Sequence, residues 1–364
     1  MKLFDFGPIA KYLGRGEASI TVPMLDGAFR PNDFLEKAQV VAEHPGADCL
    51  AVDKGRLFLS AGDSVYPVGE EASDPVARFD DDVTALAING DLVAVGLSNG
   101  GICIRGGDPE NRVITEIAGR SINCPTALYF QGNRLIVANG SDRTQADDWS
   151  RDLLERNIGG DVLAIDLKSG AEEILASHLA YANGLTETSD HKIAVSQSWN
   201  HCVSILENQN IAATASRNLP GYPSRISKAP DGGYWLAIFG MRTQLIEFIL
   251  REDSYRTQML ETVPPEYWVA PSLTSREHFM DPLQQGGVKR LGIKKPWAPP
   301  RSYGLAVKLD ANFNPILSVH SRAGGLFHGV TSALERDGIL YVTSRGAGQV
   351  RAVDLAIVEQ ETVK

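Results

Sequence analysis

The chain has 364 residues, of which 35 are Lys or Arg and 45 are Asp or Glu, so its formal net charge is −10. Hydrophobic residues make up 43% of the sequence, which is enough for a folded core and excludes an intrinsically disordered chain. The acidic balance argues against a nucleic-acid partner, and no stretch approaches the roughly 18 apolar residues that a membrane-spanning helix needs.

The N-terminal segment, residues 1–45, comes before the first repeated unit. Its opening residues lack the basic, apolar and small-residue pattern of a secretory signal, so we expect a cytoplasmic protein. Further along, Asn32 to Glu43 carries apolar residues at helical spacing, and Asp33 could cap the first turn. This pattern predicts a short helix.

A short phrase then recurs six times along the chain. Each copy has a few apolar residues, a turn with Gly, Asn or Asp, and a short strand with alternating apolar and polar residues. The copies begin near Asp48, Val83, Pro125, Ala182, Pro223 and His328. Further strands are expected at Asp161 to Leu167, Gln244 to Leu250 and Gln349 to Leu355.

Six units with room for about four strands each indicate radial repetition. The turn residues supply the positive φ that tight hairpins require. A pair of β-sandwiches is the alternative, but sandwiches do not need such self-similar units. The sequence therefore predicts an all-β, six-bladed β-propeller that forms a single domain over residues 1–364.

Residues 251–301 form a segment longer than a blade linker, and we expect it between blades five and six. It contains several prolines, two tryptophans and two methionines. A long loop in a compact domain is usually functional or disordered, and this composition favours a packed insertion. Covering an edge strand is the alternative role.

Four stretches carry more specific information: His44 to Phe58, Ala180 to Asp190, Leu219 to Ala237 and Ser302 to Val342. They resemble the strictosidine synthase-like branch of the calcium-dependent phosphotriesterase superfamily, which also includes paraoxonases and gluconolactonases. Together they span most of the chain beyond the first 40 or so residues. The resemblance implies a six-bladed propeller, in agreement with the repeats, and a small-molecule site on the propeller axis.

In the metal-dependent members, Ca²⁺ lies in the central tunnel, held by a Glu of blade one and by Asn or Asp side chains of other blades. The resemblance assigns Asp48 and Asn183 as the metal ligands in this chain. Thr126 stands where an Asn is usual, and Ser224-Arg225 stands where Asp-Asn is usual. The loss of a carboxylate and the nearby cation weaken a Ca²⁺ site, so a calcium-bound and a metal-free tunnel both stay open.

Asp48, Arg225 and His328 are the candidate catalytic residues. Asp48 could act as an acid or base, although an Asp before a strand can also only cap a turn. His328 could transfer protons near neutral pH, or could be a hydrogen-bonded core residue. An arginine is costly to bury unpaired, so Arg225 should pair with Asp48 or bind an anionic substrate group, unless it turns outward.

Thr126, Asn183, Ser224 and Trp199 are the candidate substrate-binding residues. The amide of Asn183 could bind a metal or a substrate carbonyl, or could simply belong to a turn. Ser224 has no nucleophile-elbow context, so a serine triad is not expected. Trp199 follows a strand of blade four, and could line the tunnel mouth or pack between blades.

The resemblance most often implies hydrolysis of an ester or lactone of a small organic molecule. Asp48 or His328 would be the general base, and Ca²⁺ or Arg225 would stabilise the oxyanion. One alternative is metal-independent condensation of an amine with an aldehyde, as in strictosidine synthase. The other is a propeller that binds a ligand without catalysis.

Overall fold

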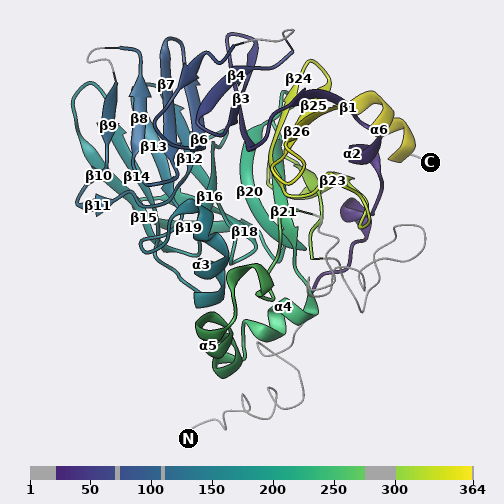
Figure 1. Ribbon diagram of the computed structural model, residues 1–364. Helices are drawn as coiled ribbons and strands as arrows, with labels where there is room; N and C mark the ends of the chain where they lie inside the picture. Colours follow the sequence, from purple (N-terminus) through teal and green to yellow (C-terminus); the bar gives the residue numbers. More distant parts are fainter. Residues whose placement is uncertain (1–21, 70–73, 108–110, 275–300, 363–364) are drawn as a thin grey trace, which may run out of the picture.

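The described strands form six four-stranded antiparallel sheets, arranged as the blades of a β-propeller (Figure 1). The computed structural model describes residues 22–69, 74–107, 111–274 and 301–362. The innermost strands of neighbouring blades contact one another around a closed ring. The six-bladed, all-β fold predicted from the repeats is therefore confirmed.

In the first three blades, the strands follow one another in chain order from the innermost strand outward. Blade one consists of β2 (Ala47–Asp53), β3 (Arg56–Ala61), β4 (Ser64–Pro67) and β5 (Ala77–Arg78). Blade two consists of β6 (Val83–Asn89), β7 (Leu92–Leu97), β8 (Ile102–Arg105) and β9 (Arg112–Ile114). Blade three consists of β12 (Pro125–Gln131), β13 (Arg134–Asn139), β14 (Gly160–Asp166) and β15 (Glu172–Leu179). A two-stranded ribbon, β10 (Glu116–Ile117) and β11 (Arg120–Ser121), lies between blades two and three in the chain.

The last three blades also begin at their innermost strands. Blade four consists of β16 (Ala182–Glu187), β17 (Ile193–Gln197), β18 (Cys202–Glu207) and β19 (Asn210–Ser216). Blade five consists of β20 (Gly221–Lys228), β21 (Tyr234–Met241), β22 (Leu305–Leu309) and β23 (Pro315–His320). Blade six consists of β24 (Val330–Arg336), β25 (Ile339–Ser344), β26 (Gln349–Asp354) and β1 (Gln39–Glu43).

Blade six closes the ring by joining the two ends of the described chain. β1 pairs with β26, with Gln39 opposite Ala352 and Glu43 opposite Gln349. Figure 1 shows this purple strand beside the yellow strands of the same blade. Closure leaves each blade with a single short outer edge, which limits unwanted strand pairing.

The helix predicted over Asn32 to Glu43 is shorter than expected. Only α2 (Phe34–Lys37) is helical, and the Asp33 side chain makes no capping hydrogen bond. The second half of the predicted segment is β1, because its Val40-Val41 pair suits a strand and finds a partner in β26. A long-range pairing therefore overrides the helical spacing. The last described helix, α6 (Leu355–Thr362), follows β26, and a short turn, η2 (Gly27–Phe29), precedes α2.

The predicted insertion lies inside blade five, between β21 and β22, rather than between blades five and six. Its described part contains α4 (Gln244–Ile249), α5 (Asp253–Thr262) and η4 (Pro265–Tyr267), whereas residues 275–300 lie outside the described residues. The strand expected at Gln244 to Leu250 is thus a helix. Thr243 explains its start, because its Oγ1 accepts a hydrogen bond from the Ile246 N–H at 3.1 Å.

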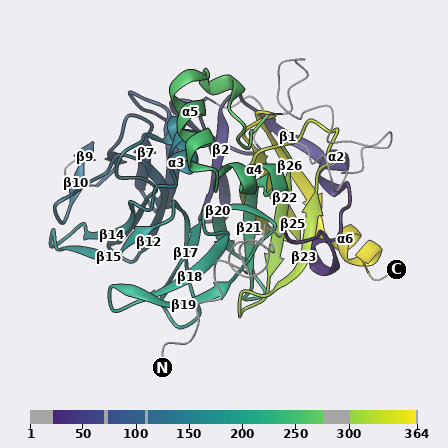
Figure 2. The same cartoon turned by 90° about the horizontal axis from the view of Figure 1, so that it is seen from below.

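The described part of the insertion is packed, as its composition indicated. Leu154, Ile249, Met259, Trp268 and Ala270 form one buried cluster, which joins the insertion to α3 (Trp149–Glu155) of blade three. The 3₁₀ turn η3 (Ala146–Asp148) leads into α3. Figures 1 and 2 show α3, α4 and α5 together on one side of the sheets.

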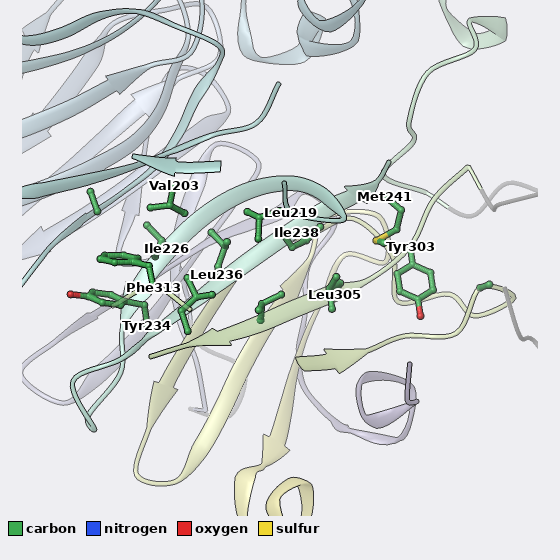
Figure 3. Close-up of a cluster of buried hydrophobic side chains, with 14 residues drawn as sticks. Val203, Leu219, Ile226, Tyr234, Leu236, Ile238, Met241, Tyr303, Leu305 and Phe313 are labelled. Atoms are coloured by element: carbon green, nitrogen blue, oxygen red, sulfur yellow. The ribbon is translucent and has the colours of Figure 1, made fainter. Parts of the chain in front are cut away.

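Apolar residues between the blades form the core. Figure 3 shows the largest cluster, where β20, β21 and β22 of blade five pack against blade four. Within it, the rings of Tyr234 and Phe313 stack 4.3 Å apart. All four cysteines are free thiols, and three of them are buried. No helix in the described parts of the chain is long and apolar enough to cross a bilayer.

A buried ion pair fixes α4 to blade five. Arg242 Nε donates to Glu247 Oε1 at 2.9 Å, and Arg242 Nη1 donates to Asn218 Oδ1 at 2.7 Å. Burial alone would raise the pKa of Glu247, but its bonds to His201 and Arg242 lower that pKa from 4.5 to about 2. The ionised carboxylate therefore contributes stability above pH 4.5, and this contribution is lost as the pH falls towards about 2.

We predict that Glu247→Gln lowers the free energy of unfolding at neutral pH by about 3 kcal/mol, because it leaves a buried guanidinium without its counter-charge. Urea unfolding measures this difference, which should shrink as the pH is lowered below 4.5. Glu173→Gln is the control, because the Glu173–Arg134 pair is partly exposed and should contribute little. A difference that stays constant on acidification would contradict the assignment.

Candidate functional site

Every innermost strand carries an irregularity in register close to its beginning. The residues that it sets out of register are Asp48 and Cys49, Thr84, Thr126, Asn183, Ser224 and Arg225, and Thr331. A β-bulge redirects a side chain and often lies beside a functional site. All of these residues except Cys49 line one cavity on the propeller axis, with a volume of about 50 Å³.

Asp48 and Arg225 form a bidentate ion pair across this cavity. Arg225 Nη1 and Nη2 donate to Asp48 Oδ1 and Oδ2, both at 2.9 Å. The same two nitrogens donate to the carbonyl of Thr331 at 3.3 Å and to that of Thr84 at 2.5 Å. Arg225 comes from blade five and is therefore bonded to blades six, one and two.

Both members of the pair are charged. Burial raises the pKa of the Asp48 carboxyl, but attraction to Arg225 and Arg345 and the hydrogen bond from Arg225 outweigh burial, so the pKa is lowered. Burial alone would lower the pKa of Arg225, but the attraction of the Asp48 charge outweighs burial, so that the pKa is raised overall. Of the three outcomes considered from the sequence for Arg225, the structure shows pairing with Asp48.

The ion pair divides the axis into two spaces. Arg225 lines the small cavity described above and also a second cavity of about 330 Å³. The second cavity is lined by later residues of the same six strands, such as Leu86, Leu128 and Leu185. The tunnel is therefore interrupted at Arg225.

Hydroxyl groups near the strand starts connect neighbouring blades. Thr84 Oγ1 donates to the Pro125 carbonyl and Thr126 Oγ1 to the Ala182 carbonyl, each at 2.6 Å. Thr331 Oγ1 donates to the Asp48 carbonyl at 2.8 Å. Thr126, predicted to bind substrate, thus also holds blade three to blade four.

Asn183 and Ser224 lie at the same level of the axis. Asn183 Nδ2 donates to Ser198 Oγ at 3.0 Å and, at 3.4 Å, to the carbonyl of Pro223. These bonds fix the amide, and both side chains line the small cavity. The structure therefore brings together four predicted residues with Arg225: Asp48, Thr126, Asn183 and Ser224.

Aromatic side chains form one wall of the cavity. Trp149, Tyr181 and Phe239 line it directly. Trp199 is not among the lining residues; its ring lies 4.4 Å from that of Tyr181, and its Nε1 donates to Asp152 Oδ1 at 2.7 Å. Of the two roles considered for Trp199, packing between blades is the one observed, because its ring also contacts Tyr222 and Phe239 of blade five.

His328 lies apart from the axial group. Its ring is fully buried, with Nδ1 bonded to Ser302 Oγ at 2.7 Å and Nε2 to the carbonyl of Arg322 at 2.8 Å. Burial lowers the pKa of the imidazole, which favours its neutral form. His328 is not among the residues that line the axial cavity. The residue of blade six at the axis is instead Thr331.

Sequence reasoning missed Thr84, Thr331 and Arg345. The first two have a sequence signal, because Val83-Thr84-Ala85-Leu86 and Val330-Thr331-Ser332-Ala333-Leu334 repeat the phrase around Thr126. Arg345 follows β25 and lines the cavity, while its Nη2 donates to Asp147 Oδ1 at 2.9 Å. Arg345 reaches the axis from the loop after β25, and no local sequence pattern indicates that position.

The axial residues do not fit the Ca²⁺ ion that the resemblance implies for Asp48 and Asn183. Asp48 supplies the only carboxylate among the residues lining the cavity, and both of its oxygens accept hydrogen bonds from Arg225. The guanidinium charge would repel a cation at that position. Among the described residues, no three His, Cys, Asp or Glu side chains are grouped so that they could hold a metal.

Curated relatives of the chain are of two kinds. It is 25% identical over 158 residues to strictosidine synthase-like 7 of Arabidopsis thaliana, covering 42% of this chain and 43% of that protein. It is 24% identical over 232 residues to the adipocyte plasma membrane-associated protein of Salmo salar, covering 62% of this chain and 50% of that protein. The chain thus spans about half the length of the curated relatives it matches first.

Among solved structures, a gluconolactonase from Xanthomonas campestris has a TM-score of 0.53, at 11% identity, over 86% of this chain and 87% of that one. At that identity the likeness shows the fold alone. No protein-family model matches the chain. The chain is therefore similar to strictosidine synthase-like proteins in sequence and to gluconolactonases in fold, which agrees with the resemblance found in its four stretches.

We predict that Thr331→Val lowers the free energy of unfolding by about 1–2 kcal/mol, because it removes the bond between blades six and one and leaves the Asp48 carbonyl without this donor. Thr343→Val in the same blade is the matched control. The Thr343 hydroxyl is buried and has no hydrogen-bond partner among the described residues, so its loss should be neutral or stabilising. Equal losses in denaturant unfolding of both variants would contradict a specific role for the Thr331 hydroxyl.

Proposed function

We propose that the protein is a hydrolase of the lactonase or esterase type, whose small organic substrate binds at the aromatic-walled end of the axial cavity. The observation that carries this proposal is the gathering of one carboxylate, one amide and two guanidinium groups around a single small space. Charged and polar groups held in fixed positions can stabilise the oxyanion formed when water attacks a carbonyl. The likeness in fold to a gluconolactonase supports the same class of protein.

Arg345 is the group that we propose to polarise the substrate carbonyl. The terminal nitrogens of Arg225 are already bonded to Asp48 and to two backbone carbonyls, which leaves that guanidinium little capacity to bind substrate. Arg345 has one nitrogen paired with Asp147, at the partly exposed rim. Its remaining donors can reach an oxygen of a molecule in the cavity.

Asp48 is the group that we propose to orient the attacking water. Each carboxylate oxygen has a second lone pair besides the one used by Arg225, and a water molecule can donate to it. The lowered pKa of Asp48 keeps it ionised at neutral pH and also makes it a weak base. Positioning of water, with Asn183 beside it, therefore contributes more than strong basicity.

Condensation of an amine with an aldehyde is the second candidate, favoured by the similarity to strictosidine synthase-like proteins. That chemistry needs a carboxyl group that exchanges protons readily, whereas the carboxyl of Asp48 is held ionised by Arg225. A panel of lactones, esters and amine–aldehyde pairs, assayed in the presence of a chelator, separates the two reactions. Ligand-induced thermal shifts without turnover of any pair would instead indicate a binding protein.

We predict that Arg345→Gln lowers kcat for lactone or ester hydrolysis about 100-fold, because it removes an oxyanion donor. Arg345→Lys should retain part of the activity, since it keeps the charge but not the planar donors. Arg134→Gln is the control, because Arg134 forms a comparable ion pair with Glu173 on the outer part of blade three. Unchanged kcat in Arg345→Gln would remove this residue from the mechanism.

We predict that kcat/KM falls to half its neutral value only at a pH below the ordinary Asp value of 3.8, since the active form is ionised Asp48 and its pKa is lowered. Activity is then lost only as the pH falls through the lowered pKa. Circular dichroism at each pH checks that the protein stays folded. A loss of activity closer to neutrality that disappears in His328→Gln would show that the histidine, not Asp48, controls the reaction.

A further inference from the structure

We infer that the Arg225 guanidinium is a built-in cation that holds the axis of the propeller together, in place of a bound metal ion. This structural role of Arg225 is independent of the proposed hydrolase activity.

The surroundings of the guanidinium resemble those of a bound cation. Four oxygen atoms from three blades converge on it: the two Asp48 carboxylate oxygens and the carbonyls of Thr84 and Thr331. Carboxylates and backbone carbonyls are the oxygens that hard divalent cations prefer. The same oxygens are here satisfied by a cation that is covalently part of the chain.

The local backbone explains why these oxygens are available. Thr84 and Thr331 each lie at a register shift, as does Asp48, so none of them pairs in register with the second strand of its blade. Without another partner, such buried carbonyls cost stability. The two-residue shift at Ser224 and Arg225 sends the arginine side chain from blade five into this gap.

The position of these bonds in the ring gives the cation a structural role. Arg225 connects blade five with the innermost strands of blades six, one and two, and blade six is the blade that β1 completes by pairing with β26. A charge centred between these blades opposes their separation. The arginine is thereby bonded to blade six, the blade that is built from both ends of the described chain.

The test compares the thermal stability of variants in a chelator and in millimolar Ca²⁺. Wild-type protein should have the same Tm in both, because its cation cannot be removed. Arg225→Ala should lower Tm by roughly 5 °C in the chelator, since Asp48 then stays buried without its bidentate partner. Ca²⁺ should restore much of this loss, because removal of the side chain opens the space among the same oxygens.

Two controls make the result specific. Arg345→Ala removes the other guanidinium of the cavity and should create no Ca²⁺ dependence, because Arg345 does not bridge these oxygens. Adding Asp48→Asn to Arg225→Ala should abolish the Ca²⁺ response, because the site then lacks its carboxylate. A Ca²⁺-dependent Tm in the wild type would overturn the inference, and so would the lack of a Ca²⁺ response in Arg225→Ala.

Arg225→Lys keeps the test decisive if the alanine variant does not fold. It retains the charge but fewer donors, so it should fold, with a Tm between those expected for the wild type and the alanine variant and no response to Ca²⁺. Failure of the lysine variant to fold, or Ca²⁺-dependent recovery of it, would overturn the role of the charge. Loss of hydrolase activity alone would bear on the proposed function and leave this inference unaffected.

Discussion

A guanidinium buried near the axis of a propeller needs a counter-charge, and in this protein a single carboxylate provides it. The bidentate pair of Arg225 and Asp48 links blade five to blade one across the ring. Removing either partner would leave a buried charge, and such a change typically costs several kcal/mol. The other features of the axis are arranged around this pair, because two backbone carbonyls satisfy the outer donors of the arginine.

The irregularity at the start of each innermost strand makes this arrangement possible. A regular strand alternates its side chains between its two faces, so it would not aim one polar group from every blade at the same point. The register shifts turn these residues towards the axis and free their backbone groups for other bonds. Threonine suits these positions, since its hydroxyl can donate to the neighbouring blade while its methyl group packs.

The features of the fold that depend on local repetition could be predicted from the sequence. The turns with Gly, Asn or Asp, each followed by a short alternating strand, predicted six blades, and the axial positions of Asp48, Asn183 and Ser224 followed from the family phrases. The insertion was misplaced because nothing local shows that β22 and β23 return to blade five after it. The helix predicted over Gln39–Glu43 is wrong because the strand partner of this segment lies more than 300 positions away, and local spacing does not reveal it.

The same reasoning explains the errors within the site. His328 lies just before β24, whereas Thr331 lies at the register shift inside that strand and lines the axial cavity. Arg345 reaches the cavity from the loop between β25 and β26, where no repeated phrase marks it. Residues on loops depend on how the whole ring closes, so their positions cannot be derived from spacing alone.

These constraints separate two tasks that a single metal ion could otherwise combine. A bound divalent cation can hold the oxygens of several blades and also polarise a substrate. The two terminal nitrogens of Arg225 are used in the first task, so in the proposed hydrolase the second task falls to Arg345. With one carboxylate and two guanidinium groups, the lining carries a positive excess inside an acidic protein. In the proposed hydrolase, that excess would favour developing negative charge on a substrate oxygen, and Arg345 is the cation with donors left to meet it.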